Sequence, residues 1–122
     1  MLTRLQLAKR RQRIRELKGR RNTLERVAMK HHLMVAASLL ERHFRPGGPA
    51  AYYLSVPSPR TSRHRYVRKA GVERIRRETS AWRQFSQTVA EWVRVNKAIE
   101  RLLREIGKGR CRDIEELGRK SG

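Results

Sequence analysis

The chain has one cysteine, few acidic residues and no long apolar segment, and each shortage excludes a class of protein. With Cys111 as its only cysteine, the 122-residue chain forms no internal disulfide and assembles no cysteine-based zinc site. Its longest apolar run, LMVAASLL with one serine inside it, is too short to cross a bilayer. The amino terminus carries charges every few residues and lacks the apolar core of a secretory signal. We therefore predict no membrane partner and a reducing compartment.

The scarce acidic residues also argue against catalysis. A magnesium-dependent enzyme needs several converging carboxylates. The 11 acidic residues of this chain are instead mostly interleaved with arginine at helical spacing, as Glu100 is with Arg104. Of the four histidines, the adjacent pair His31 and His32 would point to different faces of a helix. No glycine-rich phosphate-binding loop is present. We expect no catalytic residues, no metal site and no cofactor, and hence a protein that is not an enzyme.

Basic residues, in contrast, are in large excess. The chain holds 31 basic and 11 acidic residues, a net charge of +20, and 24 of the basic residues are arginine. Residues 1–30 hold 11 basic and 2 acidic residues (+9), and residues 60–77 hold 8 and 1 (+7). Such a charge repels itself unless a polyanion neutralises it, and the planar guanidinium of arginine suits phosphate. A nucleic acid is the predicted partner, and the two basic blocks would form one surface if the fold brings them together.

The first 43 residues are predicted to form two helices. Sparse leucine and isoleucine in a basic background indicate a weak helix that Gly19 interrupts, so residues 1–21 are interpreted as a basic N-terminal arm. Asn22 and Glu25 have capping-box spacing, which predicts a second helix over residues 22–43. Its segment LMVAASLL is apolar all round and is predicted to be the centre of the core, and RPGGP ends the helix.

A third, long helix is predicted over residues 72–106, which contain neither proline nor glycine. Its apolar positions follow alternating steps of four and three, as in a coiled coil, and form a seam of Phe85, Val89, Trp92, Asn96, Ile99, Leu103 and Ile106. A partner helix should lie along this seam. Asn96 either fixes the register or oligomer state there or faces solvent at the boundary. Residues 107–122 form a C-terminal tail, so the folded domain is predicted to span residues 22–106.

Between the helices, residues 50–69 (AAYYLSVPSPRTSRHRYVRK) predict a β-hairpin, because two segments favouring extended backbone flank a Pro- and Ser-containing turn. Two strands alone are marginal in water, so one face should lie on the helices. We expect one face to be apolar and aromatic, with Tyr52, Leu54 and Val56 as anchors, and the other to be basic. The overall fold class is thus mainly α: a helix, a β-hairpin and a long coiled-coil-like helix, with a basic N-terminal helical arm.

The stretch GPAAYYLSV, followed by RHRYVRK and a helix ending in VRVNKAIERLL, resembles a small prokaryotic domain family of unknown function. Its members carry G-P-Y-x-Y-L-S, an R-Y-V strand and a helix with an N-x-x-I type pattern, and are often encoded near transposases. The resemblance covers roughly Asn22 to Leu103 and is most specific from Gly48 to Val67. It implies the architecture and a mobile-element context. The family's cysteine cluster before the hairpin is absent here, so no metal role is implied.

We therefore predict a non-enzymatic accessory protein, of a mobile genetic element, that contacts DNA or structured RNA through the phosphate backbone. It would act in the prokaryotic cytoplasm, in association with the nucleoid or a ribonucleoprotein. One alternative is a coiled-coil subunit that recruits a larger enzyme or forms a homo-oligomer through helix 72–106, and another is a ribosomal or ribonucleoprotein component. The predicted contact residues are Arg10, Arg11, Arg13, Arg20, Arg21, Arg60, Arg63, Arg65, Arg68, Lys69, Arg74, Arg76 and Arg77.

Overall fold

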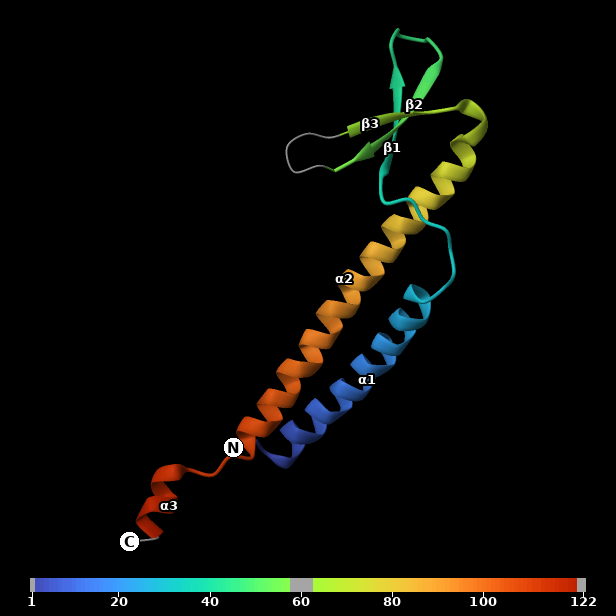
Figure 1. The fold of residues 1–122 in the computed structure, drawn as a ribbon. Helices are drawn as coiled ribbons and strands as arrows, with labels where there is room; N and C mark the ends of the chain where they lie inside the picture. Colours follow the sequence, from blue (N-terminus) through green and yellow to red (C-terminus); the bar gives the residue numbers. More distant parts are fainter. Residues whose placement is uncertain (1, 58–62, 121–122) are drawn as a thin grey trace. The chain divides into compact units, whose positions relative to one another are not determined.

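The computed structural model describes residues 2–57 and 63–120, which form a mainly helical fold with one small antiparallel sheet (Figure 1). The predicted fold class is confirmed, because an N-terminal helix, a β-hairpin and a long helix are all present. The helices are α1 (Arg4–Ala28), the 3₁₀ turn η1 (Lys69–Gly71), α2 (Val72–Gly109) and α3 (Ile114–Lys120). The strands are β1 (Ser38–His43), β2 (Ala50–Val56) and β3 (Arg63–Val67).

The chain is organised in two compact units. Met1–Val27 and Val89–Gly122 form one, here called the helical unit, and Ala28–Thr88 form the other, called the sheet unit. Helix α2 contributes to both units, its first part to the sheet unit and its second part to the helical unit. This division differs from the sequence interpretation, which set residues 1–21 and 107–122 apart from a single central domain.

Helix α1 is one continuous helix across the region where the sequence pattern predicted two helices separated at Gly19. Thr3 caps it: the Gln6 backbone N–H donates to Thr3 Oγ1 at 3.1 Å, and the Thr3 N–H donates to Gln6 Oε1 at 2.9 Å. The helix then continues through Gly19 and Asn22, so the predicted break and the predicted cap are wrong. A glycine inside a helix costs about 1 kcal/mol relative to alanine. Burial of apolar side chains on both sides of Gly19 offsets that cost, those side chains being Ile14, Leu17 and Leu24.

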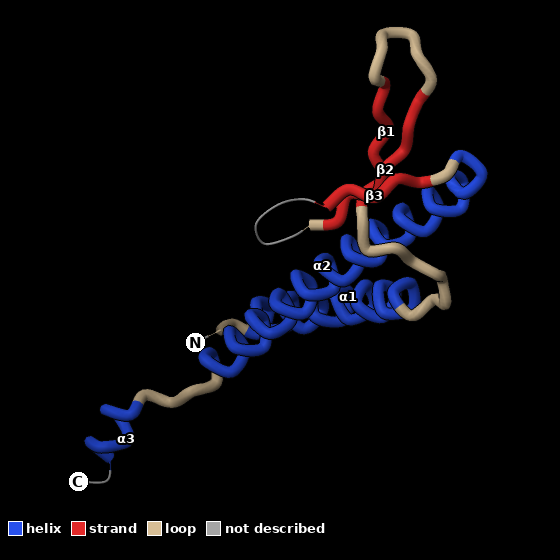
Figure 2. The backbone as a smooth tube through the Cα atoms, turned by 45° about the horizontal axis from the view of Figure 1, so that its top comes forward, coloured by secondary structure: helices blue, strands red, loops and turns tan. Residues whose placement is uncertain are grey.

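In the helical unit, α1 packs against the second part of α2, and the two helices run antiparallel (Figures 1 and 2). The core consists of Ile14, Leu17 and Ile99, flanked by the half-buried side chains of Val95, Ala98, Leu102 and Ile106. Ion pairs from Arg10 to Glu105 and from Arg20 to Glu91 show the antiparallel direction. The partner helix expected along the α2 seam is therefore α1 of the same chain.

The second helix predicted over residues 22–43 is wrong beyond Ala28, because strand β1 occupies its last six residues. The segment RPGG does not end a helix but reverses the chain between β1 and β2. Gly48 N–H donates to the Arg45 carbonyl at 2.9 Å, and Gly47 has φ of +75°. Proline at the second position and a positive-φ glycine at the third are typical of a type II turn. This turn lets β1 pair with β2 and satisfies the backbone across the strands.

The apolar segment that precedes β1 is also not the core. Leu33 is 74% exposed and Met34 38% exposed, and in LMVAASLL only Ala37 is buried. The segment is held in the sheet unit by its backbone, since the Val35 N–H donates to the Glu78 carbonyl of α2 at 3.0 Å. A helix in this position would need its apolar residues buried on several sides. The chain instead bends at Ala36 and Ala37, where the Ala37 N–H donates to the Val35 carbonyl at 2.9 Å, and then enters β1 at Ser38.

The sheet has the strand order β1-β2-β3, with both neighbours antiparallel (Figure 2). Arg65 pairs with Leu54 and Arg63 with Val56, so these arginines share a face with the predicted anchor residues. The predicted separation into one apolar face and one basic face is therefore wrong. Alternation orders the side chains within a strand, but the register between strands decides which faces coincide.

Candidate nucleic-acid interface

The sheet unit carries a run of cationic side chains where β3 passes through η1 into α2. Buried Val67 and Val72 anchor the two sides of this junction, and the Gly71 N–H donates to the Arg68 carbonyl at 2.9 Å to form the 3₁₀ turn. Between and beside these anchors the basic side chains point to solvent. We call the following exposed residues the basic strip: Arg63, Arg65, Arg68, Lys69 and Arg77.

The basic strip has no acidic counterpart. Residues 28–88 contain three carboxylates, namely Glu41, Glu73 and Glu78, and other side chains already contact each of them. Glu78 pairs with Arg74 at 3.2 Å and Glu73 with Arg76 at 3.8 Å, while Glu41 lies 3.7 Å from His43. No residue of the basic strip makes a side-chain hydrogen bond or ion pair with any part of the chain that the structure describes. Its charge is therefore uncompensated locally.

Arg74 and Arg76, also predicted as contact residues, have partners within the sheet unit. Both bind glutamates on their own helix, and the Arg76 guanidinium additionally lies 5.9 Å from the centre of the Tyr52 ring. Tyr52 in turn donates from its hydroxyl to Glu41 Oε1 at 3.2 Å. Arg76 therefore connects α2 to the sheet through a cation–π contact. Its role as a contact residue stays a prediction.

A hollow lies beside the basic strip at β3. Leu54 and Val56 of β2 and Val35 and Ala37 of the preceding segment give it apolar walls. Arg63 and Arg65 line it as well, together with Ala36 and His64, and its volume is about 620 Å³. The cationic groups of the strip thus border an apolar recess.

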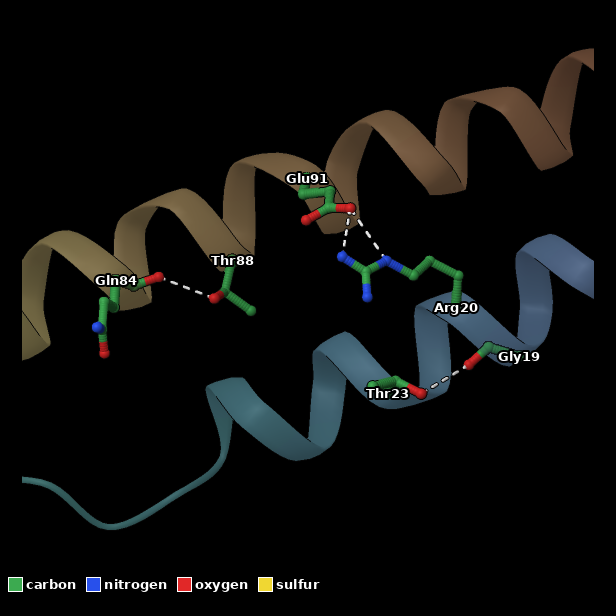
Figure 3. A network of polar contacts seen from close by, with 6 residues as sticks. All are labelled: Gly19, Arg20, Thr23, Gln84, Thr88 and Glu91. Carbon is green, nitrogen blue, oxygen red and sulfur yellow. Dashed lines mark hydrogen bonds and ion pairs between the residues drawn. The ribbon is translucent and has the colours of Figure 1, made fainter.

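The arginines of α1 lie in the helical unit, and most of those predicted to bind nucleic acid contact other residues there. Arg10 Nε donates to Glu105 at 3.0 Å, and Arg21 Nη1 donates to Asn96 Oδ1 at 2.9 Å, both in partly buried positions. Arg20 makes two hydrogen bonds to Glu91 Oε1, at 2.7 and 3.0 Å, as Figure 3 shows. The prediction treated these side chains as free cations, whereas the structure uses them to join α1 to α2.

The two remaining predicted arginines of α1 are more accessible. Arg13 is exposed and pairs with Glu16 one turn away at 3.2 Å. Arg11 is exposed and makes no side-chain hydrogen bond or ion pair within the described residues. The predicted contact residue Arg60 lies outside the residues that the structure describes.

The predicted seam of α2 differs from the observed one at two positions. Trp92, Ile99 and Ile106 are half-buried or buried as expected, but Leu103 is 54% exposed and Leu102 takes its place in the interface. Val95 similarly packs against the core where Asn96 was expected, while Asn96 is half-buried and accepts from Arg21. The other two predicted seam residues lie further toward the start of the helix. Phe85 stacks on Trp82 with ring centres 5.8 Å apart, and Val89 is 37% exposed.

Several side chains on the sheet were not among the predicted contact residues. Arg42 of β1 lies over the Tyr53 ring and reaches His64 of β3. Arg42 was not predicted as a contact residue because the residues of β1 were interpreted as part of a helix. The turn signal RPGG, read as the centre of a hairpin, would have placed it on a strand.

Metal-binding clusters and membrane-spanning helices are two other features that bear on function. Across residues 2–57 and 63–120, no three His, Cys, Asp or Glu side chains come together as metal ligands. No helix in the same ranges is long and apolar enough to span a membrane.

Comparison with known proteins identifies no relative: the chain matches no protein-family model, no curated protein and no solved structure. The resemblance of residues 22–103 to a prokaryotic family of unknown function therefore stays a prediction.

Proposed function

We propose that this protein binds nucleic acid without catalysing a reaction, and that the basic strip of the sheet unit contacts the phosphate backbone. The observation that carries the proposal is the basic strip itself, whose five exposed cations have no acidic partner among the described residues. Arginine and lysine in such a position release counterions from a nucleic acid on binding, which supplies affinity without reading sequence.

The fold also supports this assignment over binding through α1. Three predicted arginines of α1 already donate to α2, so their use would weaken the helical unit. The charged groups of the basic strip, in contrast, make no hydrogen bond or ion pair within the described residues that nucleic-acid binding would have to break. The strip lies at the junction between β3 and α2, where Val67 and Val72 are buried.

The predicted alternative was an interaction subunit that uses the α2 seam. In the helical unit α1 covers that seam, with Ile14 and Leu17 against Ile99. This occupancy argues against homo-oligomerisation through the same face. The ribonucleoprotein alternative remains a prediction that RNA affinity would favour, and the mobile-element context remains a prediction from the resemblance alone.

A salt series tests the proposal. Affinity for a random DNA duplex and for a structured RNA would be measured by fluorescence anisotropy between about 50 and 200 mM salt. If about four or five phosphates are neutralised, the logarithm of the DNA affinity should fall with a slope near −4 against the logarithm of salt concentration. Absence of binding, or binding that does not depend on salt, would overturn the proposal.

A further inference from the structure

We infer that the outer face of the sheet, opposite the anchor residues, is a stacking platform for the unpaired bases of single-stranded nucleic acid. The platform consists of Leu40, Arg42, Tyr53, His64 and Tyr66. The inference rests on the proposed function and adds to it the class of nucleic acid that the protein recognises.

The strand register places two tyrosines in the middle of this face. Tyr53 of the central strand lies directly opposite Tyr66 of β3 and opposite Leu40 of β1. The rings of Tyr53 and Tyr66 meet edge to face, with centres 5.7 Å apart and planes at 69°. Tyr66 is 61% exposed, and neither hydroxyl makes a hydrogen bond within the described residues. A large aromatic ring is thus presented to solvent on a strand of the sheet.

Cationic and polar groups surround the rings. The Arg42 guanidinium lies 5.5 Å from the centre of the Tyr53 ring, and its Nη2 donates to His64 Nδ1 at 2.9 Å. Because arginine can only donate, His64 accepts at Nδ1, and a neutral ring then carries its proton on Nε2. That N–H is a further donor on the same face. The platform therefore combines a free aromatic face, a guanidinium plane and a donor within one small area.

This combination fits an unpaired base better than a duplex. Bases in a duplex are stacked on one another and offer no face to Tyr66, whereas an unpaired base can stack on the ring with its phosphate near Arg42. The positive charge of the sheet unit selects an anionic occupant: residues 28–88 hold twelve basic and three acidic residues. A hydrophobic protein partner would instead remove the Arg42 guanidinium from water without supplying an anion to compensate its charge.

The platform and the basic strip then have separable roles. The strip attracts the backbone of any nucleic acid, and the platform prefers strands with unpaired bases. Arg63 and Arg65 belong to the opposite face of β3 from Tyr66, so Tyr66 can be replaced without removing a cation of the strip.

The test compares the affinity of the full chain for oligo(U) and oligo(dT) of about 12 nucleotides with its affinity for a duplex at fixed salt. Tyr66→Ala should weaken single-strand binding about 5- to 150-fold, the range for loss of one base–aromatic stack, and leave duplex binding unchanged. Tyr66→Phe should keep full affinity, since the hydroxyl has no partner. Tyr66→Leu, which keeps an apolar side chain against Tyr53, should lose affinity as Tyr66→Ala does, and circular dichroism checks that each variant folds.

Phe44→Ala is the matched control, because Phe44 is 74% exposed and lies in the turn beyond the end of β1. Its removal should leave single-strand affinity unchanged. Equal losses for Phe44→Ala and Tyr66→Ala, or full single-strand affinity in Tyr66→Leu, would overturn the platform while leaving the proposed function intact. Failure of the unaltered protein to bind any nucleic acid would overturn both. If the affinities for oligo(U) and oligo(dT) differ, and the difference disappears in Tyr66→Ala, the platform would be assigned to the single strand, RNA or DNA, that the unaltered protein binds more tightly.

Discussion

Arg21 of α1 donates through Nη1 to Asn96 Oδ1 of α2 at 2.9 Å inside the antiparallel helix pair. The Nε atom of the same guanidinium is buried and has no partner among the described residues. Both residues are half-buried, and the neighbours of Asn96 along α2 include Val95 and Ile99, which belong to the apolar core. A buried polar group gains little net free energy from a single hydrogen bond. We therefore expect the pair to set the register between α1 and α2 more than it stabilises the fold.

Replacing one member of this pair should cost more than replacing both. Asn96→Leu removes the acceptor of a half-buried guanidinium and should lower the free energy of unfolding by about 1–3 kcal/mol. The double variant Arg21→Leu/Asn96→Leu should recover that loss or exceed the stability of the unaltered protein. Urea denaturation followed by circular dichroism gives both values. A double variant less stable than Asn96→Leu would contradict the account of this pair.

Gly19 offers a simple gain in stability. It lies within α1, and a Cβ added there would meet no atom within 4 Å. Gly19→Ala should therefore raise the free energy of unfolding by about 0.5–1 kcal/mol, because alanine loses less backbone entropy in a helix. A change of the opposite sign in the same denaturation experiment would show that the helix is interrupted at Gly19 after all.

The same substitution at Gly47 should have the opposite effect. Gly47 has φ of +75° in the turn between β1 and β2, a conformation that costs an L-residue roughly 1–2 kcal/mol. Gly47→Ala should lower stability by about that amount, although a Cβ there meets no neighbouring atom. Gly47→Asn is the matched control, since asparagine tolerates the left-handed region and should lose less. Equal stability of the two variants would contradict the assigned turn.

Arg20 should matter little for binding although the sequence predicts it as a contact residue. Its guanidinium makes two hydrogen bonds to Glu91, and in the pair the two side chains are 52% and 37% exposed. Arg20→Ala should change stability by less than about 1 kcal/mol, as for other exposed ion pairs. Its duplex affinity should fall less than that of Arg65→Ala, whose side chain has no acidic partner among the described residues. The reverse order in an anisotropy titration would place the interface on α1.

The predictable parts of this fold are those with unambiguous local signals. The strands β2 and β3 match the expected segments, and α2 ends only three residues beyond the expected position. In each case the residues of the segment consistently favour one type of secondary structure. The segment LMVAASLL misled the interpretation because a short apolar run does not distinguish a buried helix from a loop and strand. The turn RPGG carried the decisive information, since Pro followed by Gly favours chain reversal between strands.

The site was less predictable than the fold. Composition indicates a basic surface, but it does not say which arginines a second helix will use. Arg10 and Arg21 lie at positions where a leucine would be expected in a seam, and their long apolar stems pack while their heads reach Glu105 and Asn96. Two seam registers fit the α2 sequence, one with Asn96 and Leu103 and one with Val95 and Leu102. Contacts with α1 select the second.

The most direct test of the central claim is the salt dependence of duplex binding in two charge-matched variants. One carries Arg63→Ala, Arg65→Ala and Arg68→Ala in the basic strip. The other carries Arg94→Ala, Lys97→Ala and Arg101→Ala on exposed positions of α2 in the helical unit, where none makes a side-chain hydrogen bond or ion pair within the described residues. The quantity compared is the slope of the logarithm of affinity against the logarithm of salt concentration. If the strip binds phosphate, the magnitude of this slope should fall by about three in the first variant and stay unchanged in the second. Equal slopes in the two variants would contradict the account.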